Sequence, residues 1–188
     1  MGNRKDNRPD GPESETEMRP FIRSLLSLWR AQRELRNGAL PRRQDFDPLE
    51  IGPKLLPHIS IVELDGERLR FRLCGTGLAK AAGLDLTGGY VDELNPNKEY
   101  ARYIASLYEQ ARSSRLPVLS ESVFTGALEV SKGHTQRLIC PLAQDGERVD
   151  HFIGTQAFAK SRDSVGDLTM TYAAGFAPGL TRVIGDEA

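Results

Sequence analysis

Hydrophobic positions in this chain follow two different periods. Between residues 18 and 39, and again between 97 and 114, apolar side chains recur at helical spacing, which predicts two amphipathic helices. In other segments apolar and polar residues alternate, which predicts β-strands. These segments cover residues 58–64, 69–74, 118–124, 135–143 and 149–159.

Local signals set the ends of the predicted helices. Asn37-Gly38 ends the first helix, because glycine accepts a left-handed backbone. The string DPLE at 47–50 is a strong helix start, and the prolines after it keep that helix short. Pro117 follows the end of the long helix. The buried stripe of the long helix comprises Tyr100, Tyr103, Ile104, Leu107, Tyr108 and Ala111.

The predicted strands form one sheet. Asp65-Gly66 supplies a hairpin turn between the first two strands, and the alternation places Leu69, Phe71 and Leu73 on one side. Antiparallel strands with helices gathered on one face form an α+β domain. We therefore expect a five-stranded antiparallel sheet with helices on one face and an N-terminal amphipathic helix. The long helical crossover places the first hairpin beside the last strand.

Composition narrows the class of protein. A chain of 188 residues with 39% hydrophobic and 27% charged residues has the composition of a soluble globular protein with one domain of ordinary size. No run approaches the roughly 18 apolar residues of a membrane span. Cys74 and Cys140 are too few for a disulfide framework, which favours a reducing compartment. The first residues lack the apolar core of a secretory signal, so we expect a cytoplasmic protein.

The formal net charge of −1 hides an uneven distribution. Residues 18–43 hold seven arginines against one Glu34, whereas residues 1–17 and 44–188 are net acidic. A basic amphipathic helix can lie on a membrane or bind a nucleic-acid backbone. The acidic remainder of the chain favours packing on its own domain or on a second copy.

We divide the chain into four parts. Residues 1–17 have no apolar residue after Met1 and predict a disordered leader. Residues 18–39 form the N-terminal amphipathic helix, residues 40–160 form the domain, and residues 161–188 form a C-terminal tail.

No set of residues predicts catalysis or metal binding. Gly75-Thr76-Gly77 lacks the third glycine of a dinucleotide loop and predicts a tight strand-to-helix turn. The histidines and cysteines lack the close spacing of structural zinc sites. One enzyme alternative stays open, a small α+β enzyme of hot-dog or cone-shaped type that would use His134, His151 and Asp150.

Several strings resemble the PAS family. They are LPRRQDFDPLEIGPKLLPHISIVEL at 40–64, FRLCGTGLA at 71–79, GLDLTGGYVDEL at 83–94 and RLICPLAQDGERVDHFIGT at 137–155, after a Trp29 followed by an arginine-rich helix. The resemblance covers residues 20 to 160 and is strongest to a bacterial branch whose proteins hold a single PAS domain and no output domain. It implies a PAS-like sheet around a small cavity, and dimerisation through the helix before the domain.

The resemblance also suggests which residues serve these roles. Different members hold haem, flavin, small organic acids or no ligand. The long helix here has no histidine to bind haem, and no NCRFLQ-type string surrounds Cys74, which argues against haem and photoactive flavin. Expected cavity residues are Phe71, Leu73, Tyr103, Leu107, Tyr108, Leu138 and Cys140. Expected dimer contacts are Phe21, Ile22, Leu25, Leu28 and Trp29.

We therefore expect a non-enzymatic sensory or regulatory module that forms a homodimer. Its partners would be a second copy, an unidentified small metabolite and an unidentified protein. We expect no nucleic-acid partner and no membrane span, although an adaptor role of the basic helix on a membrane or nucleic acid is an alternative.

Overall fold

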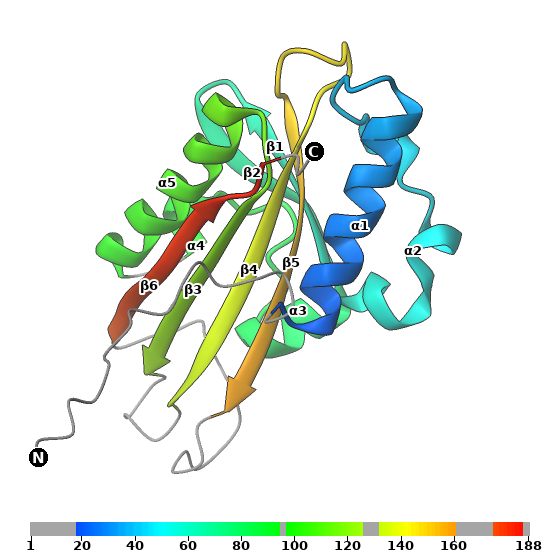
Figure 1. Ribbon diagram of the computed structural model, residues 1–188. Helices are drawn as coiled ribbons and strands as arrows, with labels where there is room; N and C mark the ends of the chain where they lie inside the picture. The colour runs from blue at the N-terminus through cyan, green and yellow to red at the C-terminus, as the bar shows by residue number, and fades with distance from the viewer. Residues whose placement is uncertain (1–17, 95–96, 126–131, 161–174, 186–188) are drawn as a thin grey trace, which may run out of the picture.

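A curved antiparallel sheet with helices on both of its faces forms the protein (Figure 1). The computed structural model describes residues 18–94, 97–125, 132–160 and 175–185. In chain order the elements are α1 (Pro20–Leu35), η2 (Arg43–Asp45), α2 (Pro48–Leu55), η3 (Leu56–His58), β1 (Ile59–Asp65), β2 (Arg68–Cys74), α3 (Thr76–Ala82), α4 (Val91–Leu94), α5 (Lys98–Ser114), β3 (Val118–Thr125), β4 (Lys132–Leu142), β5 (His151–Lys160) and β6 (Gly175–Val183). The expected leader, residues 1–17, lies outside the described residues.

The strand order across the sheet is β2-β1-β5-β4-β3-β6. The first hairpin lies beside β5, as predicted, because the crossover through α3, α4 and α5 carries the chain to the far half of the sheet. The α+β class is confirmed, but the sheet has six strands where the sequence predicted five. The sixth strand, β6, pairs with β3 and lies within the range 161–188 that was expected to be a tail.

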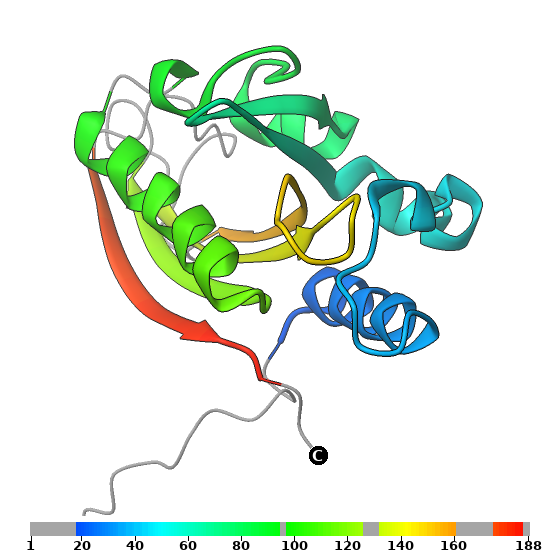
Figure 2. The same cartoon turned by 90° about the horizontal axis from the view of Figure 1, so that it is seen from above.

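The helices form two layers on opposite faces of the sheet. Helix α5 contacts β3, β4 and β6, and α4 packs beside it. Helix α1 contacts β4 and β5. Figure 2 shows α5 inside the curve of the sheet and α1 outside it. The central strands β4 and β5 are therefore buried on both faces.

Helix α1 packs on the chain's own sheet, which was one of the alternatives left open by its pattern. Its stripe of Ile22, Leu25, Leu26 and Trp29 is at most 2% exposed. The indole Nε1–H of Trp29 donates a buried 2.9 Å hydrogen bond to the carbonyl oxygen of Pro141 in β4. This bond and the apolar stripe together fix α1 against the outer face.

The first turn of α3 approaches the end of η3 very closely. A Cβ built on Gly75 would lie 2.3 Å from the carbonyl oxygen of Pro57, and one built on Gly77 would lie 2.8 Å from Cε1 of His58. Only glycine permits this approach without a backbone shift. The tight strand-to-helix turn expected at Gly75-Thr76-Gly77 is confirmed.

The β1–β2 hairpin departs from simple alternation. Asp65 pairs with Arg68, so the turn consists of residues 66 and 67. The register shifts inside the hairpin, where Ile61 pairs with Leu73 but the next residue of β1, Val62, pairs with Phe71. Successive residues of a strand point to opposite faces. Leu73 and Phe71 therefore lie on different faces, and the prediction that both share one side is wrong.

Candidate functional site

A cavity of about 120 Å³ lies between α5 and the inner face of the sheet. Helix α5 supplies one wall through Tyr100, Ile104 and Tyr108, which are four residues apart and so lie on one helix face. The side chain of Asn97 accepts hydrogen bonds from the backbone N–H groups of Glu99 and Tyr100 and starts this helix. This wall of the cavity is therefore formed by one face of a regular helix with an N-terminal cap.

The sheet supplies the opposite wall. Arg137 of β4 pairs with Gln156 of β5, and Ile139 pairs with Gly154, so these positions face the same side. The backbone at Gly154 is closely packed, since a Cβ on it would lie 3.0 Å from Oγ of Ser60 and 3.2 Å from the carbonyl oxygen of Leu138. Glycine thus lets β1 and β5 pack tightly in this wall of the cavity.

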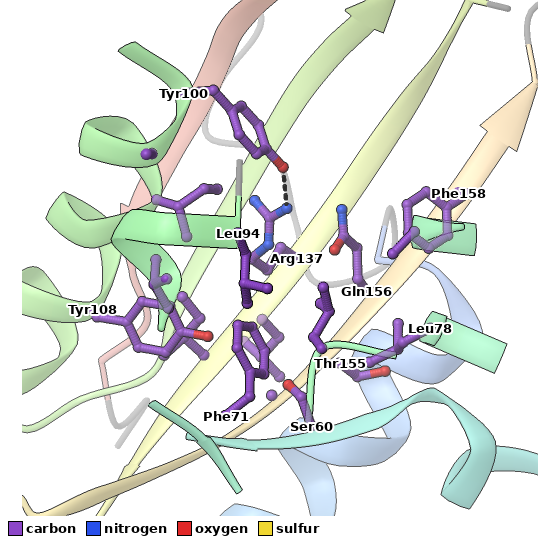
Figure 3. Close-up of a pocket in the computed structure, with 18 residues that line it drawn as sticks. Ser60, Phe71, Leu78, Leu94, Tyr100, Tyr108, Arg137, Thr155, Gln156 and Phe158 are labelled. Atoms are coloured by element: carbon purple, nitrogen blue, oxygen red, sulfur yellow. Dashed lines mark hydrogen bonds between the residues drawn. The ribbon is translucent and has the colours of Figure 1, made fainter. Parts of the chain in front are cut away.

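Apolar side chains from the hairpin, α3, α4 and β5 form most of the remaining lining. Figure 3 shows them around a few polar groups, of which Arg137 lies between Tyr100, Leu94 and Gln156. The apolar group comprises Phe71, Leu78, Ala82, Leu86, Val91, Leu94, Ala101 and Phe158. This lining suits a ligand with an apolar body and few polar atoms.

Arg137 is the charged side chain of this lining. It is 8% exposed, and its Nη2 donates a buried 2.9 Å hydrogen bond to the hydroxyl oxygen of Tyr100. Its Nη1 is also buried and has no hydrogen-bond partner. The guanidinium group therefore has free donor capacity inside the protein.

The other polar groups of the lining are tied to the protein or held neutral. Oγ1 of Thr155 donates to the carbonyl oxygen of His58 at 2.9 Å, and Nε2 of Gln156 donates to Oγ1 of Thr135 at 2.7 Å. Burial raises the pKa of Tyr108 to about 12, although the positive charge of Arg137 acts in the opposite direction. Tyr108 is thus a neutral hydroxyl at physiological pH.

The structure places three of the seven expected cavity residues in the lining, namely Phe71, Tyr108 and Leu138. The other four lie elsewhere. Leu73 is 42% exposed beyond the hairpin register shift, Leu107 is fully buried in the core, and Tyr103 stacks on Phe176 at 5.4 Å between ring centroids. A helical residue turns by about 100°, so positions 103 and 107 point beside the cavity stripe of 100, 104 and 108.

Cys140 is the fourth expected residue outside the lining. It is fully buried, and burial raises the pKa of its thiol well above the usual value. The strand period of two explains its position, since Arg137 and Ile139 take the cavity side and Cys140 takes the side of α1. Sequence reasoning missed Arg137, Tyr100, Ser60 and Gln156. An arginine inside an otherwise apolar strand was the signal that pointed to one of them.

The expected dimer residues lie along α1. Ile22, Leu25 and Trp29 are buried on the chain's own sheet, while Phe21 and Leu28 stay partly exposed. A dimer through the whole stripe would require α1 to leave the sheet. Dimerisation through these residues stays a prediction.

The residues of the enzyme alternative come together only in part. Nδ1 of His151 lies 2.8 Å from Oδ1 of Asp150 at the start of β5, and Nε2 of His151 lies 3.9 Å from Oε2 of Glu63. His134 pairs with Ala159 at the opposite end of the β4–β5 ladder and is exposed, so it is not part of this group. None of the three residues lines the cavity.

Groups that could hold a cofactor lie outside the cavity. His58 stacks on Phe21 with 4.2 Å between ring centroids, and burial lowers its pKa. The described lining contains no cysteine, and Cys74 lies at the end of β2. In the described ranges, no three His, Cys, Asp or Glu side chains gather as metal ligands.

Among the residues that the structure describes, no helix has the length and apolar character needed to cross a membrane.

Comparison with known families identifies the class. A family model described as a PAS domain matches residues 18–157. The match covers well over half of the chain, and this protein therefore belongs to the PAS domain family. None of the curated proteins that we compared with the chain matches it.

The solved structures that the chain matches in part include light-oxygen-voltage proteins. The Rhodobacter sphaeroides LOV protein is 14% identical with a TM-score of 0.42, and the match covers 54% of this chain and 58% of that one. An RNA-binding light-oxygen-voltage receptor is 14% identical with a TM-score of 0.41, and the match covers 63% of this chain and 35% of that one. The expectation that nucleic acid is not a partner stays a prediction.

Proposed function

We propose that this protein is a non-enzymatic sensory or regulatory PAS module that binds a small molecule in the cavity between α5 and the sheet. The observation that carries this proposal is the cavity itself, which is lined mainly by apolar side chains. Protein interiors are normally packed to the density of organic crystals. A cavity of this size is therefore unusual, which supports a role in ligand binding.

The chemistry of the lining supports binding over catalysis. The described lining holds no Asp, Glu, His or Cys, and its ionisable groups are Arg137, Tyr100 and Tyr108. A general acid or base works best with a pKa near the working pH. Neither an arginine nor a tyrosine whose pKa is raised to about 12 meets that condition.

Signalling requires two states with different ligand affinity. In our proposal ligand binding changes a contact of this module with a second copy or with a partner protein. The homodimer, the protein partner, the bacterial source and the cytoplasmic location remain predictions from the sequence.

Native mass spectrometry of the freshly purified full chain tests the proposal. We expect the folded protein to carry a defined extra mass, or to take up small apolar molecules when they are added. Ala101→Phe, which fills the cavity from α5, should abolish this uptake, whereas Ser106→Phe on the exposed side of α5 should not. Equal uptake by both variants, or none by the natural chain, would refute the cavity as a binding site.

A further inference from the structure

Arg137 is a buried charge without a counter-ion. Apart from its bond to Tyr100, the guanidinium group makes no hydrogen bond, and in the described part of the chain no carboxylate lies within ion-pair distance of it. Figure 3 shows the apolar side chain of Leu94 beside it, and the described lining holds no Asp or Glu. Such an arrangement is costly, because a charge removed from water must be paired or coordinated to be stable.

Deprotonation does not relieve this cost. A guanidinium group keeps its proton in proteins, so Arg137 stays positive at any physiological pH. The free Nη1 therefore needs an acceptor, and an anion satisfies both the charge and the hydrogen bond. The planar fork of an arginine matches the two oxygens of a carboxylate.

We propose that the cavity binds a small organic carboxylate, whose carboxyl group lies on Arg137 and Tyr100 and whose apolar part lies among the leucine and phenylalanine side chains. This inference rests on the proposed function, since it names the ligand class of the same cavity. The hydroxyl of Tyr100 accepts from Arg137 and retains its own proton to donate to the second carboxylate oxygen. Figure 3 shows both groups on one side of the cavity, with Phe71 and Tyr108 on the other.

The volume limits the size of the ligand. The cavity measures about 120 Å³. An engineered apolar cavity of about 150 Å³ binds one benzene ring. The present cavity is smaller than that, so a carboxyl group with a short aliphatic chain fits, whereas an aromatic ring that carries a carboxyl group exceeds it. Inorganic phosphate would satisfy Arg137 but leave the apolar walls without contact.

Calorimetric titration of the full chain with matched probes tests the inference. The probes are propionate, butyrate, their neutral isosteres propionamide and butyramide, and inorganic phosphate. We expect a carboxylate to bind at least tenfold more tightly than its amide, and phosphate to bind more weakly than either carboxylate. Arg137→Gln should weaken carboxylate binding by about tenfold to a hundredfold, because charge-assisted hydrogen bonds are lost, and should weaken amide binding by a smaller factor, because the amide carbonyl is a neutral acceptor.

Two further variants keep the test decisive. Tyr100→Phe retains the ring and removes one donor, so it should weaken carboxylate binding by about threefold to tenfold even if Arg137→Gln does not fold. Arg102→Gln, on the exposed face of α5, is the matched control and should change nothing. Equal affinity for carboxylate and amide, or phosphate binding as tight as butyrate, would overturn the ligand class while the proposed function stands. Failure of every probe to bind would refute the proposed function as well.

Discussion

Replacing Trp29 tests whether α1 is part of the domain or a surface for a second copy. Trp29→Phe retains an aromatic ring but removes the Nε1–H that donates to Pro141, a bond of 2.9 Å at a fully buried position. The lost hydrogen bond, the unpaired carbonyl oxygen and the smaller ring together should lower the free energy of unfolding by about 2 to 4 kcal/mol.

The assay is urea unfolding followed by circular dichroism, because Trp29 is the single tryptophan and the variant loses its fluorescence. The expected loss lowers the urea midpoint by about 1 to 2 M for a typical small domain. Leu35→Ala is the control on the same helix, since Leu35 is 76% exposed. That variant should stay within about 0.5 kcal/mol of the natural chain.

Protein concentration separates the two arrangements of α1. If the stripe packs on its own sheet, the difference in midpoint between the natural chain and Trp29→Phe does not change over a hundredfold range of concentration. If the stripe packs on a second copy, this difference rises with concentration. A concentration-dependent difference, or a Trp29→Phe midpoint equal to that of Leu35→Ala, would show that our account of α1 is incorrect.

Two further changes follow from the close approach at α3 and from the burial of Tyr108. Gly75→Ala places a Cβ 2.3 Å from the Pro57 carbonyl oxygen, so it should lower stability by about 1 to 3 kcal/mol or more. Gly185→Ala, where nothing lies within 4 Å, should be neutral, and equal urea midpoints for the two would contradict the packing. Because burial raises the pKa of Tyr108 to about 12, the folded state keeps a proton that the unfolded state loses from about pH 10, so stability should fall between these values. Tyr108→Phe should show a smaller alkaline loss in the same unfolding experiment, and an unchanged loss would mean that Tyr108 is not buried as a neutral group.

The order of the elements was predictable because local chemistry determines it. Asp47 accepts a 2.8 Å hydrogen bond from the backbone N–H of Leu49, as its place before Pro48 predicted. The strands 118–124, 135–143 and 149–159 correspond to β3, β4 and β5. In each case a capping side chain or a short alternation of apolar and polar residues predicts the element, without information from residues far away in the chain.

Strand β6 was not predictable in this way. It contains Pro178 and Gly179, and Leu180 and Val183 remain exposed, so its alternation is weak. Proline is tolerated on an edge strand, where an N–H that faces away from the sheet has no partner to lose. The strand forms because β3 offers it a ladder, and that partner lies more than fifty residues earlier in the chain.

The elements that enclose the cavity could be predicted from the sequence, but the side chains that face it could not. Periodicity identified the helix and strands that enclose it, but the choice between Tyr103 and Tyr100, or between Cys140 and Arg137, depends on how each element is rotated. The hairpin adds a register shift that moves Leu73 away from Phe71. Rotation and register are set by tertiary packing, which no short string encodes.

Strand β4 connects the two faces of the sheet through neighbouring residues. Arg137 faces the cavity, and the residue before it, Gln136, accepts a 2.9 Å hydrogen bond from the backbone N–H of Arg19 at the start of α1. The residue that lines the cavity and the residue that holds the start of the N-terminal helix are therefore adjacent in the chain. Thermodynamic linkage is reciprocal. If a bound ligand changes the equilibrium constant for docking of α1 on the sheet by some factor, the affinity for that ligand differs by the same factor between the docked and the released states of α1.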